Sequence, residues 1–450
     1  MALMVKHNMS AVDTLNQLNK NDSNLQKDLQ KVSSGMKINS AADDASGYAI
    51  ADRMDVQLQS LDQDQQNAQN GQSLLRVAEG AVSSTVDILR TLKEKAINAA
   101  NDTNTDADRA TIQKEFDQAI DQIDDNANVT YNGQTLIDGT KNHYVVDGGT
   151  ANVLTNKNFS IYENFDINVP LDELTDRSGR ALSIQKTDSI VISYFKGGNY
   201  IEKTIPAYDS TWGTVLSLNG TFDKEPMKSD FNLTYDADDP TYEGTDHSGN
   251  RVHALDAEMA INIRAADKGI DNQIVGFNYC IIDANGKPRT DLNNIFNDFQ
   301  ESIPAEDASP DNALDFQVGT KANQVVRMGF ADMRARALGL KTGNDPEVNL
   351  SVRTQGQANS ALQAIDTALQ KALDQQTNIG STESKLDFTN ANLVTSSENT
   401  QSSMSVIRDA NMAQMMTAYT KDSILSQTAQ AMLAQANQNS SSVLQLLQGQ

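Results

Sequence analysis

The side chains that most often carry enzyme chemistry are few in this chain and match no catalytic motif. The four histidines are His7, His143, His247 and His253, and the sequence contains no HExxH, CxxC, GxSxG or Walker-type pattern. His247 and His253 stand six residues apart in a turn rich in Gly, Asn and Asp. This pair would need a carboxylate from elsewhere in the chain to hold a metal ion. We therefore predict no enzyme activity, no catalytic residue, no cofactor and no metal.

The other reactive side chains have structural interpretations. Cys280 is the single cysteine, which excludes an intramolecular disulfide, and its apolar neighbours indicate a buried small side chain rather than a reactive thiol. Asp43 and Asp44 could act as paired carboxylates, but the dipole of a helix that starts there accounts for both. Five methionines near the C-terminus fit adaptable helix packing better than a soft-metal site: Met404, Met412, Met415, Met416 and Met432.

Composition excludes several classes of partner. The formal net charge of −24 argues against nucleic acid, because phosphate contacts need clustered Lys and Arg, and it disfavours an anionic membrane surface. No stretch approaches the roughly 18 apolar residues of a membrane span. The first residues lack the apolar core of a cleaved signal peptide. We expect a protein that is cytoplasmic or that leaves the cell without a removable leader.

The elements that position these side chains divide the chain into two similar ends and a different middle. All eight prolines and the single Trp lie between residues 170 and 346, together with most aromatic residues. The ends consist largely of Leu, Ile, Val, Met and Ala set among Gln, Asn, Ser and Asp. A chain of 450 residues exceeds one ordinary core. This pattern indicates long helices at both ends, separated by a folded insert.

Apolar residues recur at spacings of three and four at both ends, which predicts helices with narrow apolar seams. Asp22 occupies one seam position, and Gly35 ends the first helix. No third segment offers these seams a partner, so we expect them to pair with each other and then with neighbouring molecules. The predicted self-assembly seam consists of Leu15, Leu18, Leu25, Leu29, Val32, Met36, Leu425, Met432, Val443 and Leu446.

Further elements follow from local patterns. A second helix is expected from about residue 43 to residue 100, and a third helix follows a turn at 101–106. Asn132 and Gly133 predict a β-hairpin. From about residue 141 to 312, alternating segments separated by Gly, Asp, Asn and Pro predict strands, with a short helix near 254–266. Helical spacing returns near residue 355.

The predicted fold is mainly α with a β-rich insert: a long α-helical coiled-coil core from both termini, plus a β-rich outer domain. A head-to-tail contact whose rotation does not close generates an open helical polymer. Terminal seams without a partner cannot offset their ordering entropy. We therefore expect both ends to be largely disordered in an isolated subunit and to become ordered as subunits add.

Several blocks of the chain resemble bacterial flagellin. Residues 32–54, VSSGMKINSAADDASGYAIADRM, are similar to the family's most recognisable N-terminal stretch. Near the other end, IRDANMA at 407–413, ILSQTAQAMLAQAN at 424–437 and SVLQLL at 442–447 resemble its C-terminal signature. FQVG at 316–319 resembles the point where the chain returns from the variable region to the core. The likeness covers about residues 1–140 and 314–450.

The resemblance implies a structural subunit that polymerises into the bacterial flagellar filament and serves motility. It implies an inner domain of terminal helices from residues 1–42 and 400–450, and a helical core domain with a β-hairpin from 43–140 and 314–399. Residues 141–313 would form the variable β-rich outer domain. By resemblance, the chain is secreted through the flagellar export channel to an extracellular filament. Its partners would be itself, an export chaperone, the filament cap and hook-junction proteins, with no nucleic acid and no membrane.

One departure from the family concerns recognition by the vertebrate innate receptor. Flagellins that this receptor detects carry, by resemblance, an Arg and a Leu on the long second helix and a Glu on the third. Aligned on Glu94 and Ala96, this chain has Thr91 in the Arg position and Lys95 in the Leu position, whereas Glu115 retains the Glu. Losing a charged and an apolar anchor weakens an interface, so we predict weak or absent receptor activation.

Two alternative functions remain open from the sequence. A hook–filament junction protein shares the terminal helices, although the long Gln/Ala/Leu ending and the block at residues 43–54 favour the filament. Alternatively, the chain could be a filament subunit whose outer domain acts as an adhesin. A major band of the protein in sheared appendages would indicate the filament subunit rather than the junction protein. Binding of the purified insert to host surfaces would indicate an adhesin.

Overall fold

The computed structural model describes residues 8–156, 158–160, 170–173, 175–176, 180–208, 210, 231–233, 242–253, 261–343 and 347–448. Within these ranges, the side chains of His253, Val443 and Leu446 are not described. His7 and Trp212 lie outside the described residues.

The chain divides into two compact units. The first comprises residues 1–69, 317–324 and 388–450, and the second comprises residues 70–316 and 325–387. Both long helices, α2 (Ala45–Ala100) and α6 (Gln355–Arg408), contribute to both units. The three-domain scheme drawn from the sequence stays a prediction.

The first unit is helical. It contains α1 (Met9–Ser34), the beginning of α2, the end of α6 and α7 (Met412–Gln448). Asn8 caps α1 by accepting a hydrogen bond from the Ala11 amide, and Gly35 ends the helix in the left-handed conformation at φ 74°. The expected helix end at Gly35 is therefore confirmed.

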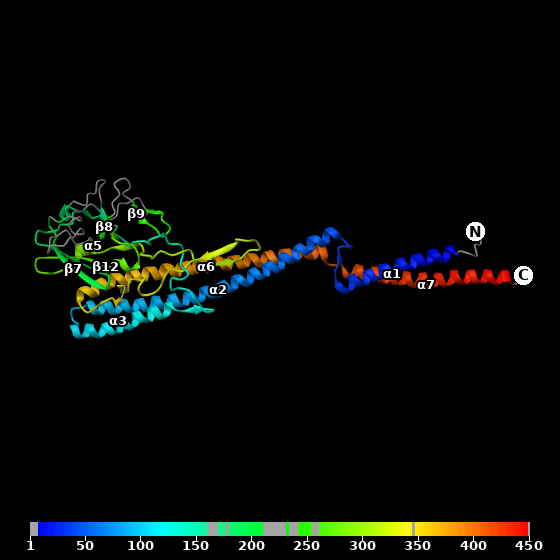
Figure 1. Ribbon diagram of the computed structural model, residues 1–450, viewed down its shortest axis with the longest axis horizontal. Helices are drawn as coiled ribbons and strands as arrows, with labels where there is room; N and C mark the ends of the chain where they lie inside the picture. The colour runs from blue at the N-terminus through cyan, green and yellow to red at the C-terminus, as the bar shows by residue number, and fades with distance from the viewer. Residues whose placement is uncertain are drawn as a thin grey trace. The chain divides into compact units, whose positions relative to one another are not determined.

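In the second unit, α2 lies beside α3 (Asp106–Ala127) and the beginning of α6 (Figure 1). Thr105 and Asp108 form a capping box at the start of α3, because each side chain bonds the other residue's backbone N–H. The apolar positions that the sequence placed on the facing sides of these helices are buried: Leu75, Val82, Val86, Leu89, Ala96, Phe116, Ile120, Ile123, Ile365 and Ile379.

Three two-stranded ribbons accompany the helices. The predicted hairpin forms from β1 (Thr130–Tyr131) and β2 (Gln134–Thr135), and its turn residues Asn132 and Gly133 have φ angles of 50° and 77°. The other ribbons pair β14 with β15 and β16 with β17. Their bounds are Leu314–Gln317, Val325–Met328, Lys341–Thr342 and Val348–Asn349.

The insert of the second unit is built from strands, as the sequence predicts. A four-stranded sheet has the order β13-β3-β11-β8, and a three-stranded antiparallel sheet has the order β12-β6-β7; β9 pairs with β10 and β4 with β5. The strands are β3 (Val153–Asn156), β4 (Phe159–Ser160), β5 (Thr175–Asp176), β6 (Ser189–Lys196), β7 (Asn199–Pro206), β8 (Phe231–Leu233), β9 (Tyr242–Thr245), β10 (Arg251–His253), β11 (Ile261–Ala265), β12 (Val275–Ile282) and β13 (Gln300–Ile303). Short helical turns occupy η1 (Leu171–Glu173), η2 (Ile270–Asn272) and α5 (Thr290–Phe296).

One expectation for the insert is wrong. The sequence suggests a short helix near residues 254–266, but Ile261–Ala265 forms β11, which pairs with β3 on one side and β8 on the other. Pairing on both sides, together with burial of Ile263 and Ala265, outweighs the local helical preference. Residues 254–260 lie outside the described part of the chain.

The three-stranded sheet lies directly against α6. A Cβ atom added to Gly276, whose φ is +64°, would overlap the Ser360 carbonyl oxygen. The hydroxyls of Ser193 on β6 and Ser360 on α6 lie 2.8 Å apart and share a hydrogen bond. This close approach joins the insert to the helical part of the second unit.

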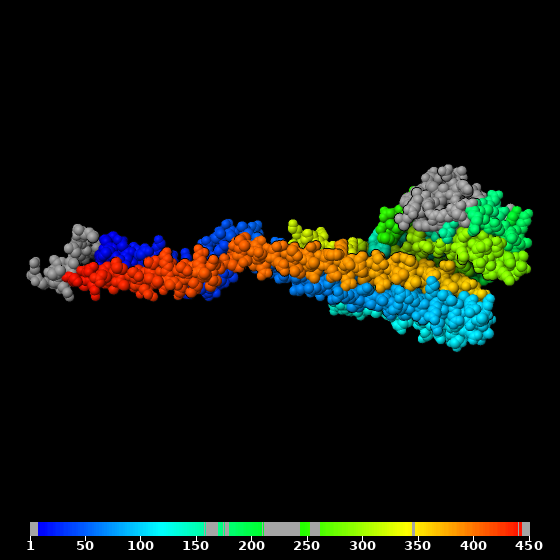
Figure 2. All heavy atoms as spheres, turned by 180° about the vertical axis from the view of Figure 1, so that it is seen from behind, coloured from blue at the N-terminus to red at the C-terminus, as the bar shows by residue number. Residues whose placement is uncertain are grey.

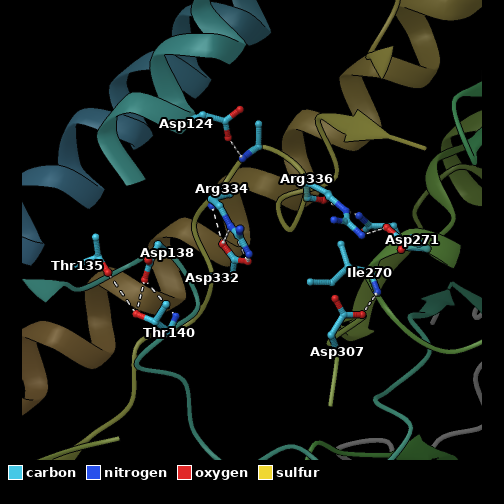
Figure 3. Close-up of polar contacts among 12 residues, drawn as sticks. Asp124, Thr135, Asp138, Thr140, Ile270, Asp271, Asp307, Asp332, Arg334 and Arg336 are labelled. Carbon is cyan, nitrogen blue, oxygen red and sulfur yellow. Dashed lines mark hydrogen bonds and ion pairs between the residues drawn. The ribbon is translucent and has the colours of Figure 1, made fainter. Parts of the chain in front are cut away.

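A loop between β15 and β16 makes a second connection within this unit (Figure 3). The Ala335 amide donates to the Asp124 carboxylate of α3 at 2.8 Å, and Arg336 forms an ion pair with Asp271 of the insert. The Arg334 guanidinium is paired with Asp332. One short loop thus contacts both α3 and the insert.

Candidate assembly surface

Helices α1 and α7 run antiparallel to each other, and polar contacts join them. Asp22, at the polar position of the predicted seam, accepts a hydrogen bond from the Ser426 hydroxyl at 2.6 Å. The Asn8 amide donates to the Ala436 carbonyl oxygen at 3.0 Å. At the opposite end of the pair, the Ala410 amide donates to the Gly35 carbonyl oxygen at 2.9 Å. Figure 2 shows the orange and red α7 alongside the blue α1.

The contact between these helices buries little apolar surface. Among the described side chains of α1 and α7, only Asn21, Ser426 and Ala429 are buried, and none of these is a large apolar residue. Burial of apolar area is the main source of helix pairing in water, at roughly 25 cal/mol per Å². Over its described side chains, the pair therefore lacks the apolar core that would hold the two helices together by themselves.

The predicted seam residues fall into two groups. Leu18, Leu25 and Val32 are half-buried on the stripe of α1 that includes Asn21 and Asp22, and Met36 is half-buried just beyond the helix. The remaining described members are exposed, with these fractions: Leu15 44% and Leu29 51% on α1, and Leu425 39% and Met432 58% on α7. Val443 and Leu446 lie on α7, but their side chains are not described.

The structure adds exposed apolar positions outside the predicted seam. On α1 and α7 the additional exposed side chains are Met9, Val12, Met412, Met416 and Ile424, and Ile424 is 58% exposed. In the sequence these positions are recognisable as apolar residues that do not fit the spacing of the seam. Exposed apolar residues are ordinary when single, but a gathering of them marks an interaction surface. The outward side chains of α1 and α7 form such a candidate surface.

The segment between α1 and α2 carries the paired carboxylates Asp43 and Asp44. The Asp44 carboxylate accepts hydrogen bonds from the Ser46 and Gly47 amides at the start of α2, and the bond from Gly47 is the main cause of its lowered pKa. Hydrogen bonds from the amides of Asn39 and Ser40 lower the pKa of Asp43 in the same way. The Asp44 carboxylate thus stabilises the start of α2, as predicted, whereas the Asp43 carboxylate closes the turn at residues 39–43 that precedes the helix.

The three receptor-recognition positions lie on the outer surfaces of α2 and α3. Thr91 is exposed, and its hydroxyl donates to the Asp87 carbonyl oxygen at 3.1 Å. Lys95 Nζ lies 2.5 Å from Glu115 Oε2, and this bond is the main cause of the raised pKa of Lys95. Lys95, at the position predicted to lack its apolar anchor, therefore pairs with Glu115, the position predicted to keep its anchor.

His247 meets a histidine and a carboxylate that are distant in the sequence. His247 lies beside His143 and Glu306, and the ligand atoms of these three residues are all within 4.8 Å of one another. The sequence reasoning considered His247 together with His253 and did not foresee the approach of His143 and Glu306. Cys280 is half-buried in β12, and burial raises the pKa of its thiol, which makes it less reactive.

Comparison with known proteins defines the family. A family model described as the bacterial flagellin N-terminal helical region matches residues 5–142, and the corresponding C-terminal helical region matches residues 362–447. A flagellin of Clostridium tyrobutyricum is 33% identical over 441 residues, which cover 97% of this chain and 99% of that protein. This chain belongs to the bacterial flagellin family. As a flagellin, it is a structural subunit of the flagellar filament.

Other flagellins match over the same length. A flagellin of Bacillus subtilis (strain 168) is 27% identical over 448 residues, covering 99% of this chain and all of that protein. These full-length matches confirm the filament subunit and favour it over the junction protein. The mainly helical fold with a β-rich middle, predicted from the sequence, is also confirmed.

Solved structures from the same class of appendage also match. FliC from Burkholderia pseudomallei matches with a TM-score of 0.25 and 15% identity, covering 70% of this chain and 99% of that chain. A flagellar hook-associated protein-3 from Legionella pneumophila matches with a TM-score of 0.33 and 15% identity, covering 79% and 99%. These scores are too low to establish a shared arrangement of the parts. Across the described helices of this flagellin, none is long and apolar enough to cross a bilayer.

Proposed function

We propose that this flagellin polymerises by burying the outward apolar side chains of α1 and α7 against neighbouring subunits. The observation that supports this is the mismatch on the helix pair: no large apolar side chain is buried among its described residues, whereas nine are exposed. These nine are Met9, Val12, Leu15, Leu29, Met412, Met416, Ile424, Leu425 and Met432. Contact with a second subunit removes this apolar area from water.

The loss of conformational entropy on ordering couples the folding of the two ends to assembly. Ordering one residue costs about 1–2 kcal/mol in backbone entropy, and α1 and α7 contain 26 and 37 residues. The few polar contacts between the two helices do not offset a cost of that size. We infer that both ends are largely disordered in the isolated subunit and become ordered as it joins the filament.

In this proposal, the filament is layered from the inside outward. Residues 1–42 and 400–450 form the inner layer, residues 43–140 and 314–399 form the next helical layer, and residues 141–313 face the solvent. The subunit is secreted through the flagellar export channel and acts outside the cell. An export chaperone, the filament cap and the hook-junction proteins are its further partners. The role of the insert as an adhesin stays a prediction.

Deletion of residues 401–450 tests the role of the helix pair. The truncated chain should remain monomeric in sedimentation and form no filaments in electron micrographs, under conditions in which the full chain polymerises. Circular dichroism and limited proteolysis should show that the insert remains folded, because its core lies in the second unit. Filaments of normal length from the truncated chain would contradict the proposal.

We also propose that the vertebrate innate receptor detects this flagellin weakly. Thr91 offers no charged group, and Lys95 holds the Glu115 carboxylate at 2.5 Å in place of an apolar side chain. A receptor that binds Glu115 must therefore displace Lys95 as well as desolvate the Glu115 carboxylate. Interfaces depend on a few such anchors, which is why two changes are sufficient.

A further inference from the structure

Two imidazoles and one carboxylate meet where the insert joins the rest of the second unit. His143 Nε2 lies 3.3 Å from Glu306 Oε2, and the rings of His143 and His247 are 4.0 Å apart at an interplanar angle of 69°. The side chains of His143 and Glu306 are 31% and 14% exposed. The three residues line one side of a cavity of about 400 Å³.

The backbone holds these three side chains in place. The Thr150 amide donates to the Glu306 carbonyl oxygen at 2.8 Å, and the Thr150 hydroxyl accepts from the Glu306 amide at 2.9 Å. The Val146 amide donates to the His247 carbonyl oxygen at 2.9 Å, which ties the β9–β10 turn to the segment that carries His143. That turn is itself closed by the Asp246 carboxylate, which accepts from the amides of Ser248 and Asn250. The cluster is therefore organised before any ligand binds.

The other carboxylates of the cavity already accept hydrogen bonds: Asp374 accepts from the Gln370 amide at 3.0 Å, and Figure 3 shows the contacts of Asp332 and Asp307. Asp332 accepts hydrogen bonds from Arg334 through both oxygens, and Asp307 accepts from the Ile270 amide at 3.0 Å. These groups line the same cavity as the histidines. Glu306 is thus the carboxylate that faces the two imidazoles.

We propose that His143, His247 and Glu306 bind one Zn²⁺ ion. Two imidazole nitrogens and one carboxylate oxygen form a ligand set that zinc prefers, and a water molecule completes a tetrahedron. Zinc bonds of about 2.0–2.1 Å place neighbouring tetrahedral ligand atoms about 3.3 Å apart. His143 Nε2 and Glu306 Oε2 already have that separation, and the ligand atoms of all three residues lie within 4.8 Å of one another. An ion pair between His143 and Glu306 alone would not account for the position of His247 beside them, whereas a shared metal ion would.

Such an ion would clamp the neck of the insert, defined as residues 142–150 and 304–309. His143 lies where the chain enters the insert, Glu306 lies where it leaves, and His247 comes from the β9–β10 turn between them. The neck strands are joined by two isolated bridges, Val145 with Ser309 and Thr150 with Glu306. A ligand that binds only the folded neck stabilises it by mass action. The ion would therefore hold the insert together outside the cell.

Metal titration of the full chain, kept monomeric and first treated with a chelator, tests the proposal. Calorimetry with Zn²⁺ should show one equivalent bound, and Co²⁺ should give the visible absorption of a tetrahedral site. Saturating Zn²⁺ at roughly 100 times its Kd should raise the melting temperature of the insert by about 5 °C or more. The variants His143→Ala, His247→Ala and Glu306→Gln should each weaken binding at least tenfold.

His253→Ala is the matched control. It removes the histidine that the sequence alone would pair with His247 and leaves the three proposed ligands in place, so one-to-one binding should persist. Glu306→Gln keeps the size of the side chain, and circular dichroism of each variant separates lost ligands from lost folding. The proposal is overturned if the wild-type chain binds no Zn²⁺, if His253→Ala abolishes binding, or if a folded His143→Ala variant binds as tightly as the wild type.

Discussion

Replacing Ile424 by Ala isolates the contribution of the outward apolar surface to polymerisation. The side chain is 58% exposed on α7, so the isolated subunit depends little on it. The substitution removes three carbons, each contributing about 0.8 kcal/mol when fully buried. Scaled by the exposed fraction, the loss on assembly is about 1.4 kcal/mol per subunit.

This loss should appear as a change in the critical concentration. For a polymer that grows by addition of subunits, the critical concentration equals the dissociation constant of the end, and about 1.4 kcal/mol corresponds to roughly a tenfold rise. The free subunit left after sedimentation of filaments at equilibrium measures it directly. Circular dichroism of the monomer at low concentration should show no change, because the second unit is not altered.

Ile97→Ala provides the matched control. Ile97 is the same residue type and is 55% exposed, but it lies on α2 in the second unit, whereas α1 and α7 belong to the first. Its critical concentration should stay within about threefold of the wild-type value. An unchanged critical concentration for Ile424→Ala, or an equal rise for Ile97→Ala, would refute the assignment of the assembly surface to the helix pair.

Three further predictions follow from other parts of the chain. Gly276→Ala should destabilise the second unit by about 2–5 kcal/mol in urea denaturation, because the residue has a positive φ and the added Cβ would overlap α6. Gly286 also has a positive φ but has open space around it, so Gly286→Ala should destabilise the unit by only about 1–2 kcal/mol. The double variant Thr91→Arg/Lys95→Leu should activate a receptor reporter cell at least tenfold more strongly than the wild type, and equal activity would contradict the proposed anchors. Burial, with a hydrogen bond to a nearby carboxylate, raises the pKa of Tyr200 to about 12. The unfolded phenol loses its proton first, near pH 10, so stability should decline between about pH 10 and pH 12, and Tyr200→Phe should lack that part of the decline.

Local patterns were sufficient for the helices, their ends and the hairpin. Gly35 ends α1, Thr105 caps α3, and Asn132 with Gly133 forms the turn, because each depends on backbone geometry within a few residues. The buried positions of α2 and α3 were also predictable, since a helix that packs against another presents its apolar residues at a fixed period. The concentration of proline and aromatic residues also indicated the insert, because strands and turns use these residues more than long helices do.

Tertiary structure decided what depends on segments distant in sequence. Spacing alone could not separate Leu18, which is half-buried, from Leu15, which is exposed, because both fit one apolar seam. Ile261–Ala265 became a strand because two other strands pair with it. His143, His247 and Glu306 meet because folding brings the two ends of the insert together, and no spacing along the chain encodes that meeting.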